Sequence, residues 1–134
     1  MKSILFIATL FLLTGCSTVN SFFVAKYDTN EYELINWIRT TAELSHESCD
    51  STDLSKQNFV TLYRGSLEFR NFTQYIKRNT DTFELATNLH QLVDQGLGMY
   101  ATNETVSQPF CELSLEQIAV SAETIQKVLG DKPR

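Results

Sequence analysis

Residues 30–48 read NEYELINWIRTTAELSHES, and their apolar side chains recur at the three- and four-residue spacing of an α-helix. Glu31 and Glu43 fall on the opposite, polar face of that helix. Asn30 with Glu33 three positions later fits a capping box, so the stretch predicts an amphipathic helix that starts at Asn30. The inward face would carry Leu34, Ile35, Ile38, Thr41, Ala42 and Ser45, with Trp37 and Leu44 along one edge.

The second helical segment, residues 52–78, carries two apolar stripes instead of one. The stripes lie roughly 150° apart around the helix axis. Because a straight helix cannot bury both stripes in one core, we expect a bend or break at Gly65-Ser66, between them. The alternative is a straight helix with one stripe exposed as a partner-binding face. The first stripe is Phe59, Val60, Tyr63 and Leu67, and the second is Leu62, Phe69, Phe72 and Ile76.

Two more helical segments follow. The third helix begins at the capping residue Asp81 and would end at Gly96 and Gly98, and the fourth begins at Ser114 and stops at Gly130. Neither strand-like alternation nor an internal repeat occurs in the sequence. Four helices with short connections predict an all-α fold, a small up-and-down four-helix bundle.

The composition is that of one small globular domain, with 134 residues, 43% of them hydrophobic, and a net charge of −5. The excess of acidic residues argues against a nucleic-acid partner, because nucleic-acid binding normally needs a basic surface. Three cysteines mean that at least one has a role other than an intrachain disulfide.

The first cysteine, Cys16, ends a segment that resembles the signal of bacterial lipoproteins. Lys2 precedes an apolar run at residues 4–13, and the sequence L-T-G-C that ends at Cys16 resembles a lipobox. The resemblance implies cleavage before Cys16 and acyl chains on its sulfur and new amino terminus. Because Ser17 follows and not aspartate, it also implies an outer-membrane destination. An ordinary secretory signal or a short membrane anchor is the alternative. The expected organisation is a signal peptide at 1–15, a lipidated tether at 16–29 and a helical domain at 30–134.

The other two cysteines, Cys49 and Cys111, are expected to form a disulfide in an oxidising compartment. They fall at the end of the first helix and before the fourth, which an up-and-down bundle places at the same end. The tether would join the opposite end, beside the turn at residues 79–82. A metal site built on His46 and Cys49 is the alternative, but it lacks the four ligands that structural zinc usually takes. We expect one disulfide and no metal.

Motifs for catalysis are missing from the sequence. Neither His46 nor His90 has an evident nucleophile assigned to it, and no glycine-rich phosphate loop is present. We therefore expect no catalytic residue and no cofactor. A peptidoglycan-cleaving enzyme would need an acid such as Glu43 or Glu68, so a small cell-wall hydrolase or its accessory stays open as the alternative.

The sequence favours a non-enzymatic module, anchored in the outer membrane by lipid on Cys16 and facing the periplasm, that binds another envelope protein. Assembly factors, inhibitors or immunity proteins, and phage lysis or exclusion lipoproteins all fit this description. The basic residues of the second helix are candidate contacts, although they could simply neutralise neighbouring acidic helices. Two aromatic residues in the predicted polar loop at 99–110 are further candidates. The five candidate contact residues are Arg70, Lys77, Arg78, Tyr100 and Phe110.

Overall fold

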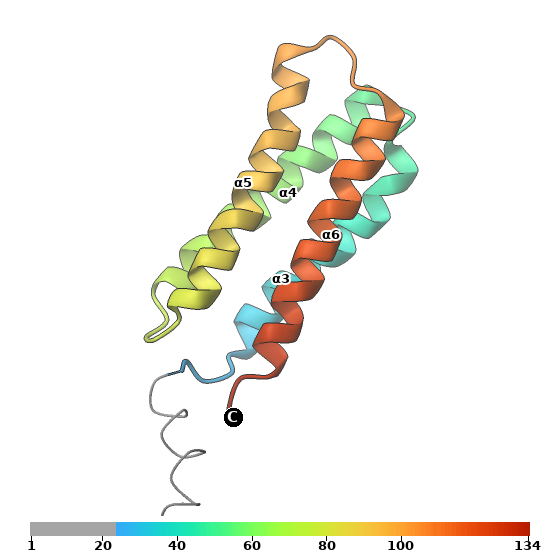
Figure 1. Ribbon diagram of the computed structural model, residues 1–134. Helices are drawn as coiled ribbons and strands as arrows, with labels where there is room; N and C mark the ends of the chain where they lie inside the picture. Colours follow the sequence, from blue (N-terminus) through green and yellow to red (C-terminus); the bar gives the residue numbers. More distant parts are fainter. Residues whose placement is uncertain (1–23) are drawn as a thin grey trace, which may run out of the picture.

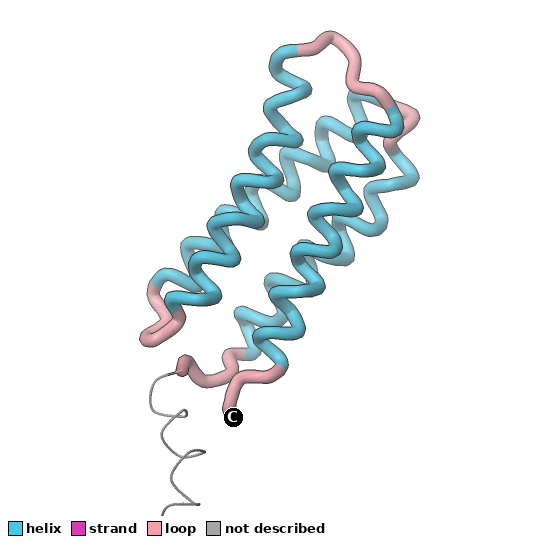
Figure 2. The backbone as a smooth tube through the Cα atoms, in the orientation of Figure 1, coloured by secondary structure: helices cyan, strands magenta, loops and turns pink. Residues whose placement is uncertain are grey.

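The computed structural model describes residues 24–134, which fold into four long α-helices (Figure 1). Each helix runs antiparallel to the next; α3 packs mainly against α6, and α4 packs mainly against α5. The described part contains helices and loops but no strand (Figure 2). The prediction of an all-α, up-and-down four-helix bundle is confirmed. The helices are α3 (Thr29–Ser45, continued by a 3-10 turn at His46–Ser48), α4 (Thr52–Gln74), α5 (Thr80–Thr102) and α6 (Gln108–Gly130).

Each helix buries one seam whose members alternate at steps of four and three residues, the spacing of helices that pack side by side. On α4 this seam combines members of both predicted stripes, because small polar residues such as Ser66 and Thr73 fill the positions between them. The helix continues through Gly65, so the predicted break is absent. Phe59 of the first stripe and Leu62 and Phe69 of the second are buried, and the other stripe residues are partly buried. The α4 seam is Ser55, Phe59, Leu62, Ser66, Phe69 and Thr73.

The first helix begins earlier than the sequence predicted. Asp28, and not Asn30, caps α3: its Oδ1 atom accepts a hydrogen bond from the backbone N–H of Glu31 at 3.0 Å. Glu31 lies on the inner face of α3, because it precedes Ile35 by four residues and Ile38 by seven. Glu31 is fully buried, although its charge predicted a position in solvent.

The two helices that flank the last loop are longer than predicted. α5 continues through Gly96 and Gly98, so neither glycine ends it. Gly96 lies in the seam, where a β-carbon would overlap the ring of Phe59, and its missing side chain therefore serves packing. α6 begins after the capping residue Ser107, and Ser114 lies inside the helix. The predicted polar loop is correspondingly shorter.

One end of the bundle, called the disulfide end below, holds the bond between Cys49 and Cys111. The two Sγ atoms are 2.01 Å apart and the two Cα atoms 5.6 Å apart. Both cysteines are buried and extend the seams of their helices. The predicted disulfide, and its link between the end of the first helix and the start of the last, are confirmed.

The opposite end, called the terminal end below, brings together residues 24–28, the turn between α4 and α5 and the C-terminal residues (Figure 1). The backbone N–H of Ala25 donates to the carbonyl of Arg78 at 3.1 Å, and that of Tyr27 donates to the carbonyl of Pro133 at 2.9 Å. The incoming chain is therefore fixed beside the α4–α5 turn, as the sequence predicted.

Candidate functional site

A shallow apolar groove lies on the outer side of the bundle between α3 and α4. Two adjoining hollows share Glu68 and Phe72, so the groove is continuous. Its floor is formed by partly buried apolar side chains, and its carboxylates, Glu33 and Glu68, are exposed. The lining residues are Asn30, Glu33, Leu34 and Trp37 of α3, with Arg64, Leu67, Glu68, Asn71 and Phe72 of α4.

Trp37 is the largest side chain in this groove. Its indole lies against α4 at Gly65, where a β-carbon would overlap the ring. The absence of a side chain at Gly65 thus lets the indole approach the α4 backbone, while 44% of Trp37 stays exposed. This close approach explains why position 65, where the sequence predicted a bend or break, is a glycine.

Two exposed leucines extend the groove toward the disulfide end. Leu44 follows Trp37 by seven residues on α3, and Leu54 precedes Phe72 by eighteen residues on α4, so each lies on the same side of its helix as the groove residue. Leu44 is 68% exposed and Leu54 is 52% exposed. The groove together with these two leucines is called the α3–α4 surface below.

A buried polar cluster lies at the terminal end. The Nζ atom of Lys132 donates to Glu31 Oε2 at 3.0 Å and to Asn79 Oδ1 at 2.5 Å, and Asn79 Nδ2 donates to Glu31 Oε1 at 2.5 Å. Asn79 also donates to the carbonyl of Thr73 at 3.3 Å. These bonds join the start of α3, the α4–α5 turn and the C-terminal segment. The spacing of Glu31 from Ile35 and Ile38 places it on the buried face, but the sequence prediction followed its charge, because a glutamate in a first helical turn is ordinarily a capping or solvent residue.

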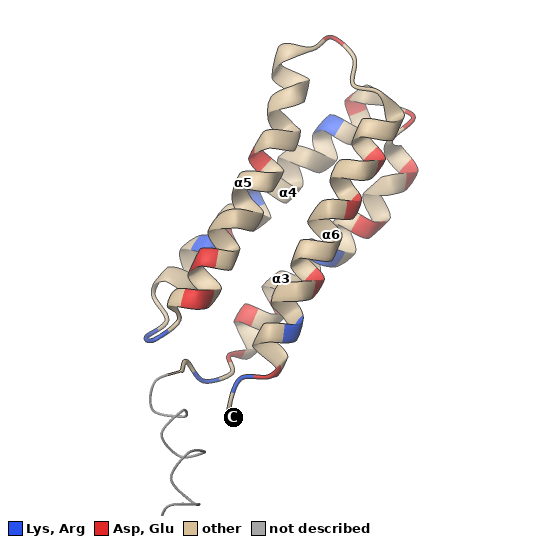
Figure 3. Cartoon of the chain, in the orientation of Figure 1, with Lys and Arg blue, Asp and Glu red and all other residues tan. Residues whose placement is uncertain are grey.

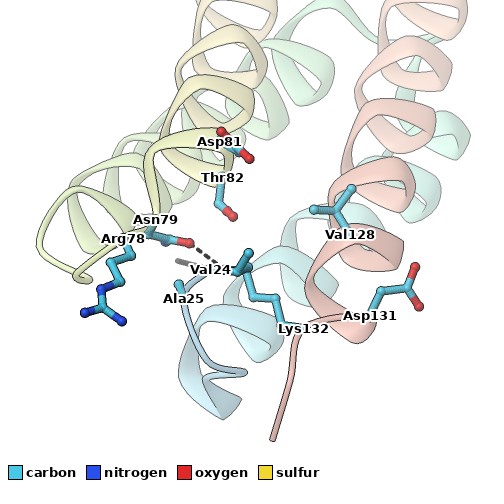
Figure 4. A pocket seen from close by; sticks show the side chains of 9 residues that line it. All are labelled: Val24, Ala25, Arg78, Asn79, Asp81, Thr82, Val128, Asp131 and Lys132. Carbon is cyan, nitrogen blue, oxygen red and sulfur yellow. Dashed lines mark hydrogen bonds between the residues drawn. The ribbon is translucent and has the colours of Figure 1, made fainter. Parts of the chain in front are cut away.

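A small cavity of about 120 Å³ lies beside the polar cluster (Figure 4). Asn79 and Lys132 form part of its wall and hydrogen-bond to each other there. The Nζ atom of Lys132 hydrogen-bonds to Glu31 and Asn79. The cluster therefore holds the C-terminal segment against the start of α3 and the α4–α5 turn. The other lining residues are Val24, Ala25, Arg78, Asp81, Thr82, Val128 and Asp131.

His90 has a hydrogen-bond partner, Ser66, that the sequence did not predict. Its Nδ1 atom lies 2.9 Å from the Oγ atom of Ser66, and because that hydroxyl donates to the carbonyl of Tyr63, it accepts its second bond from the imidazole N–H. Burial lowers the pKa of His90, the positive charge of Arg70 lowers it further, and Asp94 opposes the shift. Ser66 is fully buried, so its hydroxyl is out of reach of a substrate.

The basic candidate contacts do not form one patch. Arg70 packs between α4 and α5, with its guanidinium 5.8 Å from the centre of the Phe83 ring and its Nε atom buried. Lys77 and Arg78 are exposed, but they lie in the turn beyond the end of α4. The structure therefore places these two residues at the terminal end, apart from Arg70 in the helix interface.

The two aromatic candidate contacts differ in their exposure to solvent. The expectation that Tyr100 is exposed is wrong: it is 5% exposed, and its ring centroid lies 5.3 Å from that of Phe59. The reason is the extra length of α5, which places Tyr100 in the seam four residues after Gly96. Phe110 is half-buried in the first turn of α6.

The structure gives the residues of the alternative metal site and the two candidate glutamates different partners. Cys49 is bonded to another cysteine, so it cannot serve with His46 as a zinc ligand in this structure. Among residues 24–134, no group of three or more His, Cys, Asp or Glu side chains could hold a metal ion. Glu43 is paired with Arg39 at 2.8 Å, whereas Glu68 lies in the groove.

Comparison of the chain with protein-family models, characterised proteins and solved structures finds no match. The predicted signal peptide and Cys16 lie outside the described residues. Within residues 24–134, none of the helices is both long enough and apolar enough to cross a membrane.

Proposed function

We propose that this chain is a lipoprotein anchored in the outer membrane through Cys16, and that its bundle binds another envelope protein through the α3–α4 surface. The module is non-enzymatic and acts as an assembly factor, an inhibitor or immunity protein, or a phage lysis or exclusion protein. The anchor rests on the resemblance of the segment ending at Cys16 to a lipobox.

The observation that carries the binding role is the exposure of three large apolar side chains along one side of the bundle. Trp37, Leu44 and Leu54 lie on the α3–α4 surface and are each more than two-fifths exposed. Covering such side chains gains roughly 25 cal/mol for each Å² of apolar surface removed from water. Exposed large apolar side chains bordered by polar residues are typical of a protein-binding site.

The charge of the rim indicates the chemistry of the partner. Glu33 and Glu68 line the groove, and Arg64 is the one cation among its lining residues. Glu43 of α3 and Glu47 of the 3-10 turn that follows it flank Leu44 in the sequence. A partner that offers apolar side chains flanked by lysine or arginine would therefore complement this surface in both hydrophobicity and charge.

The anchor would hold the bundle near the membrane. Eight peptide units separate Cys16 from Val24, and a chain of that length reaches at most about 28 Å when fully extended. The α3–α4 surface would thus be presented to proteins that lie within or close to the same membrane.

The experiment that tests this proposal uses the full chain expressed in bacteria. Mass spectrometry of the membrane fraction should find acyl chains on Cys16, and Cys16→Ser should remove them. A partner should co-purify with the wild-type chain and with Val120→Asn, a matched change of an exposed residue on α6, but not with Leu44→Asn. A chain without acyl chains, or equal recovery of the partner with both variants, would contradict the proposal.

A small peptidoglycan hydrolase, or an accessory to one, is the second candidate. One observation favours it: Glu68 lies in the groove with Trp37 and Phe72, and aromatic rings of this kind can stack on sugars. Glu43, the other candidate acid, is engaged by Arg39. Release of soluble muropeptides from cell wall by the purified chain, with loss of release in Glu68→Gln, would select this function over the first.

A further inference from the structure

Lysine and arginine residues are distributed unevenly along the axis of the bundle (Figure 3). Cations gather at the terminal end, on the α4–α5 turn, on the chain before α3 and on the C-terminal segment. Carboxylates lie at both ends: exposed Glu33, Asp81, Glu84 and Asp131 lie near the terminal end, and others lie near the disulfide end. The exposed cations of the terminal end are Lys26, Lys77, Arg78 and Arg134, and the exposed carboxylates of the disulfide end are Glu47, Asp50, Asp53 and Glu104.

Three of these cations line one hollow at the terminal end. Lys26, Lys77 and Arg78 surround it together with apolar parts of Val24, Ala25, Tyr27 and Ile76. The one carboxylate in this hollow, Asp28, accepts the capping hydrogen bond at the start of α3. Two further carboxylates, Asp81 and Asp131, line the cavity on the other side of Arg78. The hollow itself is therefore a predominantly basic surface.

The backbone at Arg78 is a second observation about this hollow. Among the described non-glycine residues, Arg78 alone has a positive φ, 64°. Glycine or asparagine would adopt that conformation at a lower energetic cost. The turn nevertheless places a long cationic side chain at the terminal end, where Figure 4 shows it directed away from the helices.

We propose that Lys26, Lys77 and Arg78 dock on the phosphate groups of anionic lipids in the membrane that holds Cys16, so that the bundle stands upright on its terminal end. This inference rests on the proposed lipid anchor. The described chain begins at Val24, in the wall of this hollow, only eight residues after Cys16. The anchor would therefore keep this hollow within about 28 Å of the membrane surface.

The length of the bundle makes the orientation selective. A helix of 23 residues is about 34 Å long, whereas electrostatic interactions are screened over about 8–10 Å at physiological ionic strength. In the upright orientation the carboxylates of the disulfide end lie beyond the field of the anionic lipids. In a tilted orientation those carboxylates and the acidic residues along the helices would approach the same negative surface and be repelled.

The test measures the height of the disulfide end above the bilayer. The acylated full chain, with a fluorophore at exposed position 105, is inserted into vesicles that contain acceptor lipids. In vesicles with phosphatidylglycerol, energy transfer should be low, because the fluorophore stands about one helix length from the surface. Transfer should rise several-fold in pure phosphatidylcholine vesicles and in the Lys26→Gln/Lys77→Gln/Arg78→Gln variant.

Two controls make the result specific. Lys56→Gln removes an exposed cation near the disulfide end and should leave the transfer low. The Lys26→Gln/Lys77→Gln variant leaves the Arg78 backbone unchanged and should give an intermediate rise, which separates loss of docking from misfolding. Equal transfer in all variants and both lipids, for a chain with confirmed acyl mass, would overturn the docking alone. A chain without acyl mass would overturn the anchor and the docking with it.

Discussion

The indole of Trp37 on α3 lies where a side chain at Gly65 of α4 would otherwise stand. Trp37 is also the chain's single tryptophan, so its fluorescence reports directly on the α3–α4 surface. The contact links the packing of the two helices to the exposed groove on which the proposed function rests.

Gly65→Ala should push the indole of Trp37 outward, because the new β-carbon would overlap the ring. We expect the tryptophan emission to shift to longer wavelength as the ring becomes more hydrated. Gly98→Ala is the matched control, since a β-carbon at that helical position meets nothing within 4 Å. It should raise the free energy of unfolding by about 0.5–1 kcal/mol through helix propensity and leave the emission unchanged. An unshifted emission spectrum in Gly65→Ala would disprove the packing described here.

The disulfide should contribute much of the stability of the domain. Cys49→Ala/Cys111→Ala should lower the free energy of unfolding by about 3–4.5 kcal/mol, because the bond closes a loop between residues 62 positions apart. Urea denaturation with and without reductant checks this value. The reductant should lower the midpoint of the wild-type chain and leave that of the variant unchanged. Equal midpoints for the variant and the oxidised wild-type chain would contradict the prediction.

The buried pair of Glu31 and Lys132 should be strongly coupled. Lys132→Met leaves the Glu31 carboxylate buried without its cation, and loss of one partner of a buried pair costs about 3–5 kcal/mol. Glu31→Leu should be similarly destabilising. The double variant should lose far less stability than the sum of the two single changes, and a double-mutant cycle by urea denaturation measures the difference. Additive losses would show that the pair is not coupled.

Stability should fall on mild acidification because of His90. Burial lowers the pKa of His90 in the folded chain, so the unfolded chain binds a proton first, and stability is lost as the pH falls below about 6.5. His90→Gln, which can still hydrogen-bond to Ser66, should flatten the dependence of the melting temperature on pH between about 7 and 5. His46→Gln serves as the control and should retain it. An identical pH dependence in the wild-type chain and His90→Gln would contradict this account.

The sequence was sufficient to predict the topology of the fold, because the apolar period on each segment and the positions of Cys49 and Cys111 point to the same arrangement. The sequence did not predict the buried face of α4, because serine and threonine occupy several of its seam positions. Only Phe59, Leu62 and Phe69 of the two predicted stripes lie in the seam, so the spacing of apolar residues did not reveal it. The two glycines make room for aromatic rings, and both helices continue through them: Gly65 faces Trp37 and Gly96 faces Phe59.

The residues of the candidate site were harder to predict. The sequence predicted that Trp37 and Leu44 form one edge of the first helix. Their exposure also depends on the distance between α3 and α4, and a local sequence pattern does not predict that distance. Tyr100 was misplaced because the end of α5 was misplaced. Glu31 and Lys132 lie 101 positions apart in the sequence, and only the closed bundle brings them together.

The most direct test of the central claim is photocrosslinking in living cells from two exposed positions. A photoreactive residue in place of Leu44 lies on the α3–α4 surface, and one in place of Val120 lies on the outer side of α6. We predict one adduct of defined mass from position 44, none from position 120, and loss of the adduct when Leu54→Glu places a charge on the same surface. Equal adducts from both positions, or an adduct from position 44 that survives Leu54→Glu, would contradict the claim that this surface binds an envelope protein.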